Sequence, residues 1–320
     1  MKIYPYILIF LLAGCQIAFG WSYNSHVNMT ALAAAYVFNL DTSAAAPKVA
    51  PFQVRIKYDV HEDFGETVGM SLNLLGTGGI LESFVGAIID VTVLEDKFKV
   101  DTIMTYPPPK KPSVNTLYKI MKEAGSDPDT YDARTGLIGR GEMLVGHIYG
   151  PNGIGFADFM AQFCYNQAVK AWKQNQKNQA FVFLAYASHY IEDCGIPVHA
   201  EADYRNLDVL QWQMGYHSFT EDYVADHWME KYQATAAEAA QVPMPVCDIG
   251  AMVRSLAMET NPDIAEWNKA WGQKGGKYNP GDQPANQKKF DELVKQEIWR
   301  CVPRVSGLFM KFKQEVMGGK

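Results

Sequence analysis

HYIEDCGIPVH, residues 189–199, follows a run that is apolar on nearly every face, QAFVFLAYAS at residues 179–188. A segment without a polar face predicts a helix that is buried all round. His189 and Asp193 are four residues apart, so on such a helix they lie on the same face and can bind one ion. The stretch therefore predicts a buried helix that ends in a metal-binding pair.

Further candidate ligands follow closely along the chain. Pro197 is expected to end the helix, which places His199 on the turn beyond it. His217 and Glu221 repeat the four-residue spacing in YHSFTEDYV, on a second predicted helix. A single histidine on an apolar face is usually a core residue. Two imidazole–carboxylate pairs and a linking histidine, however, supply the nitrogen and oxygen ligands that zinc needs, so these five residues are interpreted as zinc ligands.

The rest of the chain is predicted to be mostly helical. The three consecutive prolines of TYPPPKKP (105–112) exclude a helix or a sheet interior and predict a loop. Residues 41–60 are expected to be irregular or extended, and residues 80–97 are compatible with a helix or a strand. No linker in the C-terminal third is long enough to attach a separate membrane-binding β-domain, so a single all-α domain is predicted. The other expected helices are residues 26–40, 114–124, 157–174, 218–232, 234–240 and 286–313.

Composition and charge limit the classes of function. The chain has 320 residues, 48% of them hydrophobic, which is enough to form a sizeable core. A formal net charge of −6 leaves no broad basic surface, so a dedicated nucleic-acid-binding protein is not expected. The four cysteines beyond residue 20 permit two disulfides in an exported protein, and the alternative is free buried thiols. They are Cys164, Cys194, Cys247 and Cys301.

Residues 1–20 have the pattern of a signal peptide. Lys2 is followed by the apolar run YPYILIFLLA (4–13), which is too short to span a bilayer comfortably. Two processing signals overlap here. Small residues in AFG favour cleavage before Trp21, whereas LAGC, ending at Cys15, has the form of a bacterial lipoprotein box. Both alternatives predict that the protein is exported.

Four motifs together resemble the zinc-dependent phospholipases C of bacteria, which share an all-helical trizinc fold with the fungal and plant single-strand zinc nucleases. The motifs are HYIEDCGIPVHA, GYHSFTEDYV, GHIYGPNG around His147, and WSYNSH from Trp21. The resemblance covers residues 21 to about 230, with a poorly matched insert at 41–125. It implies one helical catalytic domain over residues 21–320, preceded by the signal peptide.

The resemblance implies three zinc ions held by nine residues. Trp21 would use its free α-amine and carbonyl oxygen, which favours cleavage directly before it over lipidation of Cys15. A carboxylate can span two cations, and open positions on the ions leave room for water and phosphate oxygens. The nine are Trp21 and His26 on one ion, Asp132, His147 and His189 on a second, Asp193 bridging these two, and His199, His217 and Glu221 on the third.

The aspartate upstream of His147 in the family pattern has three candidates in this sequence. Asp132 lies fifteen residues ahead of His147, close to the family spacing, and is favoured as ligand and general base. Asp129, eighteen residues ahead, and the distant Asp63 remain alternatives. Residues of this kind in turns are more often solvated capping groups.

Other histidines and aromatic residues fall outside the pattern. His61 and His227 have no place in it, and His227 is assigned a surface or core role. Phe64, Tyr149 and Phe156 could line a pocket for a quaternary ammonium group by cation–π attraction, although packing is the default role of each.

The resemblance leads to two enzymatic hypotheses and one other. The first is a secreted, monomeric phospholipase C that meets a membrane surface transiently. It would hydrolyse phosphatidylcholine-like lipids to diacylglycerol and a phosphorylated head group with a zinc-activated water. The alternative is a zinc-dependent single-strand nuclease, which the short spacing from Trp21 to His26 favours, whereas Glu221 favours the phospholipase because the nucleases usually carry aspartate there. The third is a zinc-binding protein without enzymatic activity.

Overall fold

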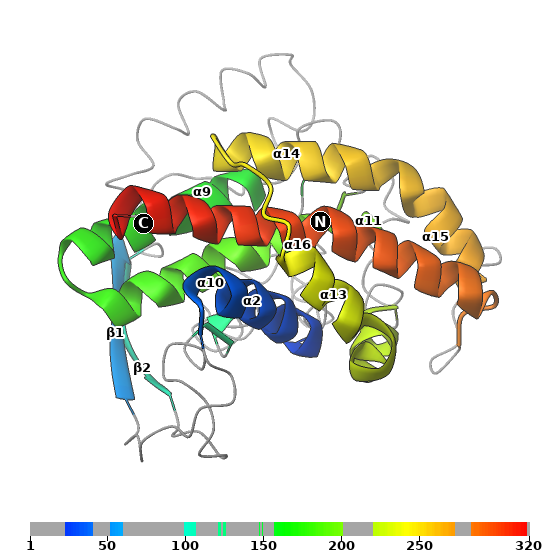
Figure 1. The fold of residues 1–320 in the computed structure, drawn as a ribbon, viewed down its shortest axis with the longest axis horizontal. Coiled ribbons are helices and arrows are strands. Elements are labelled where there is room, and N and C mark those ends of the chain that lie inside the picture. Colours follow the sequence, from blue (N-terminus) through cyan, green and yellow to red (C-terminus); the bar gives the residue numbers. More distant parts are fainter. Residues whose placement is uncertain are drawn as a thin grey trace, which may run out of the picture.

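The protein is predominantly helical, and the prediction of an all-α fold is confirmed (Figure 1). The computed structural model describes residues 23–40, 52–59, 99–106, 121–122, 124–125, 147, 149, 157–200, 220–272 and 283–318. The helices are α2 (Tyr23–Phe38), α9 (Ala157–Lys173), α10 (Lys177–Cys194), α11 (Pro197–Ala200), α13 (Gln233–Ala240), α14 (Ile249–Thr260), α15 (Ile264–Trp271) and α16 (Gln287–Val316), with a π-helix η1 (Trp228–Tyr232) and a 3-10 turn η2 (Asn261–Asp263).

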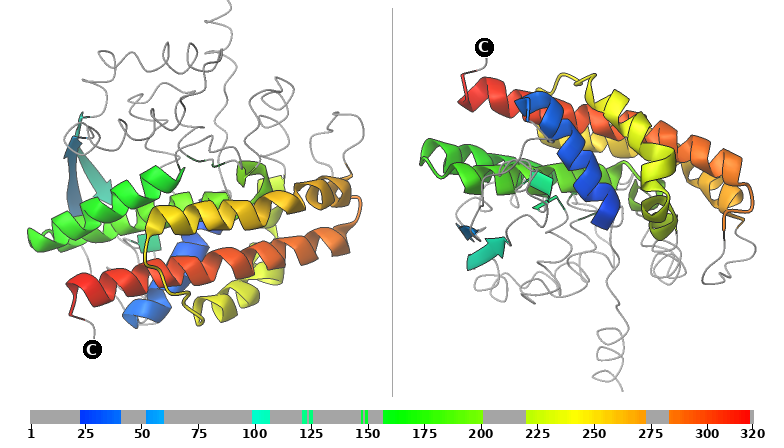
Figure 2. Two further views of the ribbon diagram at one scale, coloured as in Figure 1. Left: turned by 90° about the horizontal axis from the view of Figure 1, so that it is seen from above. Right: turned by 60° about the horizontal axis from the view of Figure 1, so that its bottom comes forward.

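Helix α10 lies at the centre of the bundle, packed against α9, α2, α14 and α16 (Figures 1 and 2). Every residue from Ala180 to Cys194 is buried, as its apolar sequence predicts. The last two turns of this helix nevertheless carry a histidine and two carboxylates. Because water cannot reach them, these groups need partners inside the protein.

The end of α10 differs from the prediction. The helix stops at Cys194 and not at Pro197, and Gly195 follows it at a point of close approach to α16. A β-carbon at Gly195 would lie 2.7 Å from Cβ of Cys301, so only glycine fits there without a shift. Pro197 instead begins α11, where the missing N–H of a first helical residue is not needed. His199 consequently lies on a one-turn helix and not on a turn.

Helix α16 runs along the whole bundle. It confirms the helix predicted for residues 286–313, with Asn286 as its N-cap, whose side chain accepts a hydrogen bond from the backbone N of Lys289. Pro303 lies inside the helix, and its carbonyl oxygen accepts a hydrogen bond from the backbone N of Met244 at 2.8 Å. The segment that joins α13 to α14 therefore crosses directly over α16 (Figure 1).

Helices α14 and α15 were not expected from the sequence. Asp248 caps α14 by accepting a hydrogen bond from the backbone N of Ala251, and Gly272, with φ 95°, ends α15 in the left-handed region. Seen from above, both helices run alongside α16 (Figure 2). They extend the bundle beyond the segment that matches the family motifs.

The other expected elements agree in part. Helices α2, α9 and α13 confirm the helices predicted at residues 26–40, 157–174 and 234–240. The helix predicted at 218–232 is α-helical over 220–226 and continues as η1 after a turn at His227. Of the helix predicted at 114–124, the described residues 121, 122 and 124 are helical.

A pair of strands lies beside the helical bundle. Strand β1 (Phe52–Asp59) falls in the segment expected to be extended and pairs antiparallel with β2 (Lys99–Tyr106). The loop predicted from residue 105 therefore begins later, because Thr105 and Tyr106 still pair with β1. Residues 1–20 and 80–97 lie outside the described part of the chain.

Two further observations concern the whole of the described structure. The four cysteines beyond residue 20 are all free, which agrees with the alternative of free thiols, although Cys247 is exposed. Among the residues searched, no helix combines the length and the apolar character that a membrane crossing requires.

Candidate metal centre

Six of the nine residues assigned as zinc ligands are described, and all six are buried. They are brought together by helices that are far apart in the sequence. The six are His26 on α2, His147 ahead of α9, His189 and Asp193 on α10, His199 on α11, and Glu221 within helical residues 220–226. The other three, Trp21, Asp132 and His217, lie outside the described residues, as do Asp129, Asp63, His61, Phe64 and Phe156.

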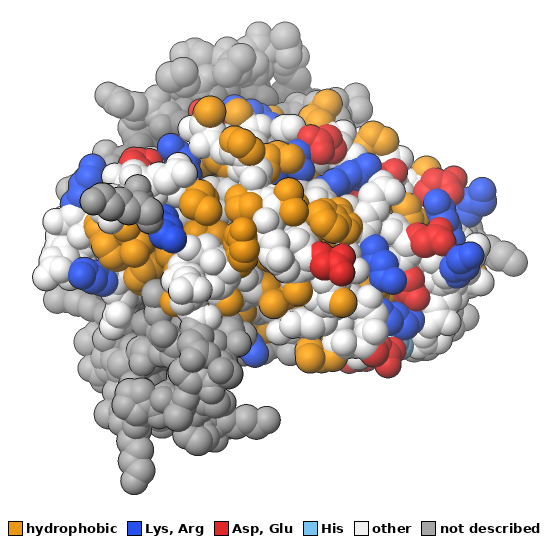
Figure 3. All heavy atoms as spheres, in the orientation of Figure 1, with side chains coloured by type: hydrophobic (Ala, Val, Ile, Leu, Met, Phe, Trp, Pro, Cys, Tyr) orange, Lys and Arg blue, Asp and Glu red, His pale blue; other side chains and the backbone are white. Residues whose placement is uncertain are grey.

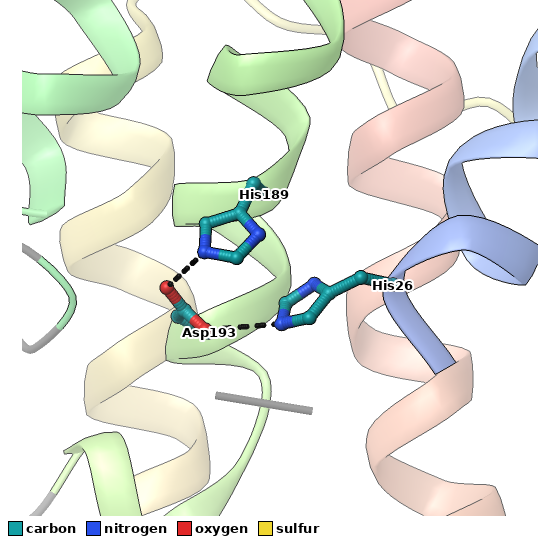
Figure 4. A group of neighbouring side chains, drawn as sticks. All are labelled: His26, His189 and Asp193. Carbon is teal, nitrogen blue, oxygen red and sulfur yellow. Dashed lines mark ion pairs between the residues drawn. The ribbon is translucent and has the colours of Figure 1, made fainter. Parts of the chain in front are cut away.

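Asp193 contacts three other members of this group, of which Figure 4 shows His26 and His189. Its Oδ1 is 3.3 Å from Nε2 of His26 on α2. Its Oδ2 is 2.6 Å from Nδ1 of His147 and 3.3 Å from Nε2 of His189. One carboxylate oxygen thus faces one nitrogen donor and the other oxygen faces two, so each oxygen has donors of its own, as a bridging ligand requires.

His199 and Glu221 form the third part of the centre. Nε2 of His199 is 3.5 Å from Oε1 of Glu221, although the two residues come from different helices. Nδ1 of His199 is 4.0 Å from Oδ1 of Asp193, so this pair is adjacent to the other two groups.

Three of the histidines are held by their Nδ1 atoms. Nδ1 of His189 donates to the carbonyl oxygen of Gly125 at 2.9 Å, and Nδ1 of His199 donates to the carbonyl oxygen of His147 at 2.8 Å. Nδ1 of His26 donates to Oε2 of Glu192 at 2.7 Å. A histidine whose Nδ1 carries the proton presents the lone pair of Nε2, and in each case Nε2 faces the centre.

The separation of His26 from Asp193 fits zinc. Ligands about 2.0 Å from a tetrahedral zinc ion lie about 3.3 Å from one another. Nε2 of His26 and Oδ1 of Asp193 have this separation, and neither atom makes a hydrogen bond within the described part of the chain. The donor atoms of His26, His189 and Asp193 all lie within 4.8 Å of each other. Two buried polar atoms that face one another without a hydrogen bond are what a site for a cation leaves.

Burial and charge shift the pKa values of the group. Burial lowers the pKa of His26, but its contacts with Asp193 and Glu192 outweigh this and raise it to about 10. Burial raises the pKa of Asp193, but His189 and other nearby histidines hold it well below its ordinary value. Burial lowers the pKa of His199. A metal ion that binds His26 would therefore displace a proton from it.

The sequence analysis missed the groups that hold the histidines. Glu192 is buried beside Asp193, and its Oε1 accepts a hydrogen bond from the hydroxyl of Thr30 at 2.8 Å. The signal was present, because a glutamate inside a helix that is apolar on nearly every face must have a buried partner. The carbonyl oxygen of Gly125, in contrast, carries no signal in its residue type.

The remaining predictions at the edge of the centre have simple outcomes. The ring of His227 lies 4.2 Å from that of Tyr223, and its Nδ1 donates to the carbonyl oxygen of the same residue. This agrees with a role outside the ligand set. Tyr149 is half-buried, and its backbone N donates to the carbonyl oxygen of His199 at 3.2 Å, so its backbone supports the centre.

Fold and centre together define an all-α protein with a buried group of histidines and carboxylates. No protein-family model and no curated protein sequence matches the chain. Among solved structures it is similar to the alpha toxin from Clostridium absonum, at 12% identity and TM-score 0.46, over 95% of this chain and 65% of that one. It is also similar to the alpha-toxin of an avian strain of Clostridium perfringens, at 13% identity and TM-score 0.41, over 96% and 66%. The chain thus spans just under two thirds of the length of these toxins, and the likeness concerns the fold alone.

Proposed function

We propose that the chain is a zinc-dependent phosphodiesterase of the phospholipase C type. The observation that carries the proposal is the position of Asp193, whose two carboxylate oxygens each face histidine nitrogens within a buried centre. The motifs shared with the bacterial phospholipases C support the same conclusion. The proposal does not depend on the likeness to the toxins.

Three zinc ions are proposed, held by the nine residues that the motifs assign. Zinc, when bound, would supply a Lewis acid for phosphate oxygens and lower the pKa of a coordinated water. The chain contributes the orientation of the donors, since the Nδ1 atoms of His26, His189 and His199 are already held by acceptors. It also contributes burial, because charges excluded from water interact more strongly with one another.

Proton transfer is assigned to the aspartate upstream of His147. Asp132 would accept a proton from the attacking water, since a carboxylate placed beside the reacting group is a suitable general base. Asp129 and Asp63 are the alternatives to it, as argued from the sequence. Substitution of each by asparagine would identify the base, because only one of the three changes should abolish turnover.

The proposed substrate is a phosphatidylcholine-like phospholipid, cleaved to diacylglycerol and a phosphorylated head group. Glu221, the last ligand along the chain, lies in a segment that matches the phospholipase form of the motif. The spacing from Trp21 to His26 instead favours a nuclease for single strands, which we keep as the second candidate. We further propose that the protein is a monomer that contacts a membrane surface transiently and is not a dedicated nucleic-acid binder.

One metal-replete preparation tests both candidates. Release of phosphocholine from phosphatidylcholine vesicles is compared with release of nucleotides from single-stranded nucleic acid, in each case with and without a chelator. Lipid cleavage that zinc restores after chelation supports the phospholipase. Cleavage of nucleic acid alone would support the nuclease, and inactivity on both substrates at full zinc content would leave a zinc-binding protein without this activity.

We also propose export with cleavage directly before Trp21, so that its amine is free to bind zinc. Retaining the residues after Cys15 would turn that amine into an amide, which is a poor donor. Mass spectrometry of the exported protein distinguishes the two. A chain that begins at Trp21 supports the proposal, and a lipidated Cys15 contradicts it.

A further inference from the structure

Glu192 is buried on α10 and belongs to none of the three proposed ligand groups. Both of its oxygens are bonded to α2. Oε2 accepts from Nδ1 of His26 at 2.7 Å, and Oε1 accepts from the hydroxyl of Thr30 at 2.8 Å. His26 and Thr30 are four residues apart, so they lie on one face of α2 and approach the carboxylate together.

The ring of His26 lies between two neighbouring carboxylates of one helix. Glu192 binds Nδ1, and Asp193 faces Nε2 at 3.3 Å. The ring therefore spans the two carboxylates, and its plane and tilt are fixed by the bond at Nδ1. If that bond were absent, the ring could turn about χ1 and χ2 and move Nε2 away from Asp193.

The other oriented histidines have different acceptors. His189 and His199 donate to backbone carbonyls, which no substitution of a side chain removes. Glu192 is a side-chain carboxylate, and it accepts from the Nδ1 of His26 without being an assigned ligand itself. The role of such an outer partner can be measured by mutation in this case.

We propose that Glu192 is a positioning residue that aims Nε2 of His26 at the metal ion shared with Asp193. The inference rests on the proposed zinc centre. Outer carboxylates of this kind fix the tautomer and orientation of a metal-bound histidine, and their loss weakens metal binding by about 10–100-fold. Thr30 supports Glu192 in turn, because its hydroxyl holds the oxygen that does not bind His26.

The test compares Glu192→Ala, Glu192→Gln and Thr30→Val with a matched control, Glu297→Gln. Glu297 is a second fully buried glutamate, on α16, whose partners Thr260 and Arg300 are not ligands. Zinc content is measured by elemental analysis, and zinc affinity by titrating the metal-free protein against a competing chelator. Thermal unfolding of each variant is recorded alongside.

We expect Glu192→Ala to lose the zinc ion that His26 shares with Asp193, or to bind that ion about 10–100-fold less tightly. The other ions should stay in place. Glu192→Gln keeps an acceptor without the charge and should weaken the same ion by less. Thr30→Val should have a smaller effect of the same kind, and Glu297→Gln should retain the wild-type zinc content.

Two results would overturn the inference. One is wild-type zinc affinity in both Glu192→Gln and Glu192→Ala. The other is a loss of zinc in Glu297→Gln equal to that in the Glu192 variants, since this would indicate a general effect of altering a buried carboxylate. If Glu192→Ala does not fold, Glu192→Gln and Thr30→Val decide. If the wild type binds zinc but cleaves no phosphodiester, the proposed function fails, whereas the zinc affinities still test the role of Glu192.

Discussion

Asp193 connects two groups of donors through its two carboxylate oxygens, so its charge serves both. We predict that Asp193→Asn loses at least one zinc ion and more than about 100-fold in turnover, since the loss of an outer partner alone already causes about 10–100-fold. The amide has the shape of the carboxylate but lacks the negative charge that can bind two cations. Zinc content and phosphodiester hydrolysis measure the effect.

The matched control for this substitution is Asp158→Asn. Asp158 is not an assigned ligand and binds Arg254 at 2.7 Å, in an ion pair whose arginine is about half exposed. An exposed pair of this kind contributes roughly 0–1 kcal/mol to stability, so the control should keep its zinc and its activity. Wild-type turnover in Asp193→Asn would instead mean that the pair with His189 is structural.

Glu297 supports a prediction about pH and stability. Burial raises its pKa to about 8 from an ordinary value of 4.5, although Arg300, 2.8 Å away, opposes this. A carboxyl group whose pKa is raised on folding stabilises the protein fully below the unfolded value. That contribution is lost as the pH rises through about 8.

The stability of the wild type should therefore fall relative to Glu297→Gln between pH 5 and pH 8, on the order of a few kcal/mol, because the neutral amide does not ionise. Urea denaturation of both proteins at the two pH values measures the difference. Parallel dependence of the two free energies of unfolding on pH would contradict the assignment.

At the level of the elements, α16 depends on a glycine where the α13–α14 connection crosses it. A β-carbon at Gly307 would lie 1.9 Å from the carbonyl oxygen of Met244, and backbone cannot move aside as a side chain can. We predict that Gly307→Ala destabilises the protein by about 1–3 kcal/mol or more, the usual effect of overpacking. Thermal or urea unfolding measures it.

Gly250→Ala is the control for helix propensity. Gly250 lies in the first turn of α14, and the nearest atom to an added β-carbon is the end of the Arg254 side chain, at 3.2 Å. That side chain can shift, and alanine favours a helix over glycine by about 1 kcal/mol. The control should be neutral or stabilising. Equal effects of the two substitutions would contradict the crossing as the cause.

The elements that the sequence predicted correctly are those with a strong local signal. The apolar run before His189 correctly predicted that α10 is buried, because a helix without a polar face is stable only in the core. The rule for proline was wrong at Pro197, which begins α11, and Pro303 lies inside α16, where its carbonyl accepts from Met244. Proline lacks a backbone N–H group, and the surrounding structure decides whether a hydrogen bond from that group is needed.

The candidate site could be predicted only where its ligands are close in sequence or in a known motif. Helical spacing alone predicted that His189 and Asp193 form a pair. In the structure, Nε2 of His189 lies 3.3 Å from Oδ2 of Asp193. No spacing rule connects His26 with Glu192, which are 166 residues apart, because packing of α2 against α10 brings them together. The partners of the ligands were therefore beyond a reading of the sequence.

At the scale of the molecule, hydrophobic side chains gather on the face over α16 and its neighbours (Figure 3). The large exposed hydrophobic residues include Met258 and Trp299, at 53% and 43% exposure. More than half of an ordinary protein surface is contributed by apolar atoms, so this face alone does not identify a partner. The proposed contact with a membrane rests on the substrate and not on this surface.

The centre ties together segments that are far apart in the sequence, from His26 on α2 to Glu221 in residues 220–226. An ion bound by donors from several helices binds the folded protein and not the unfolded chain, so it must stabilise the fold. At a free concentration of zinc about 100 times the dissociation constant, one site adds about 2.7 kcal/mol. For a chain of this size we expect a rise in melting temperature on the order of 5 °C or more.

Thermal unfolding should therefore shift to lower temperature after chelation and return when zinc is added, with Asp193→Asn as the comparison. In that variant the ions no longer share a charged bridge, so zinc should raise the melting temperature by clearly less than in the wild type. A general effect of zinc on the surface would instead raise both equally. Identical melting temperatures of the wild type with and without zinc would show that these buried histidines and carboxylates do not bind zinc in the folded protein.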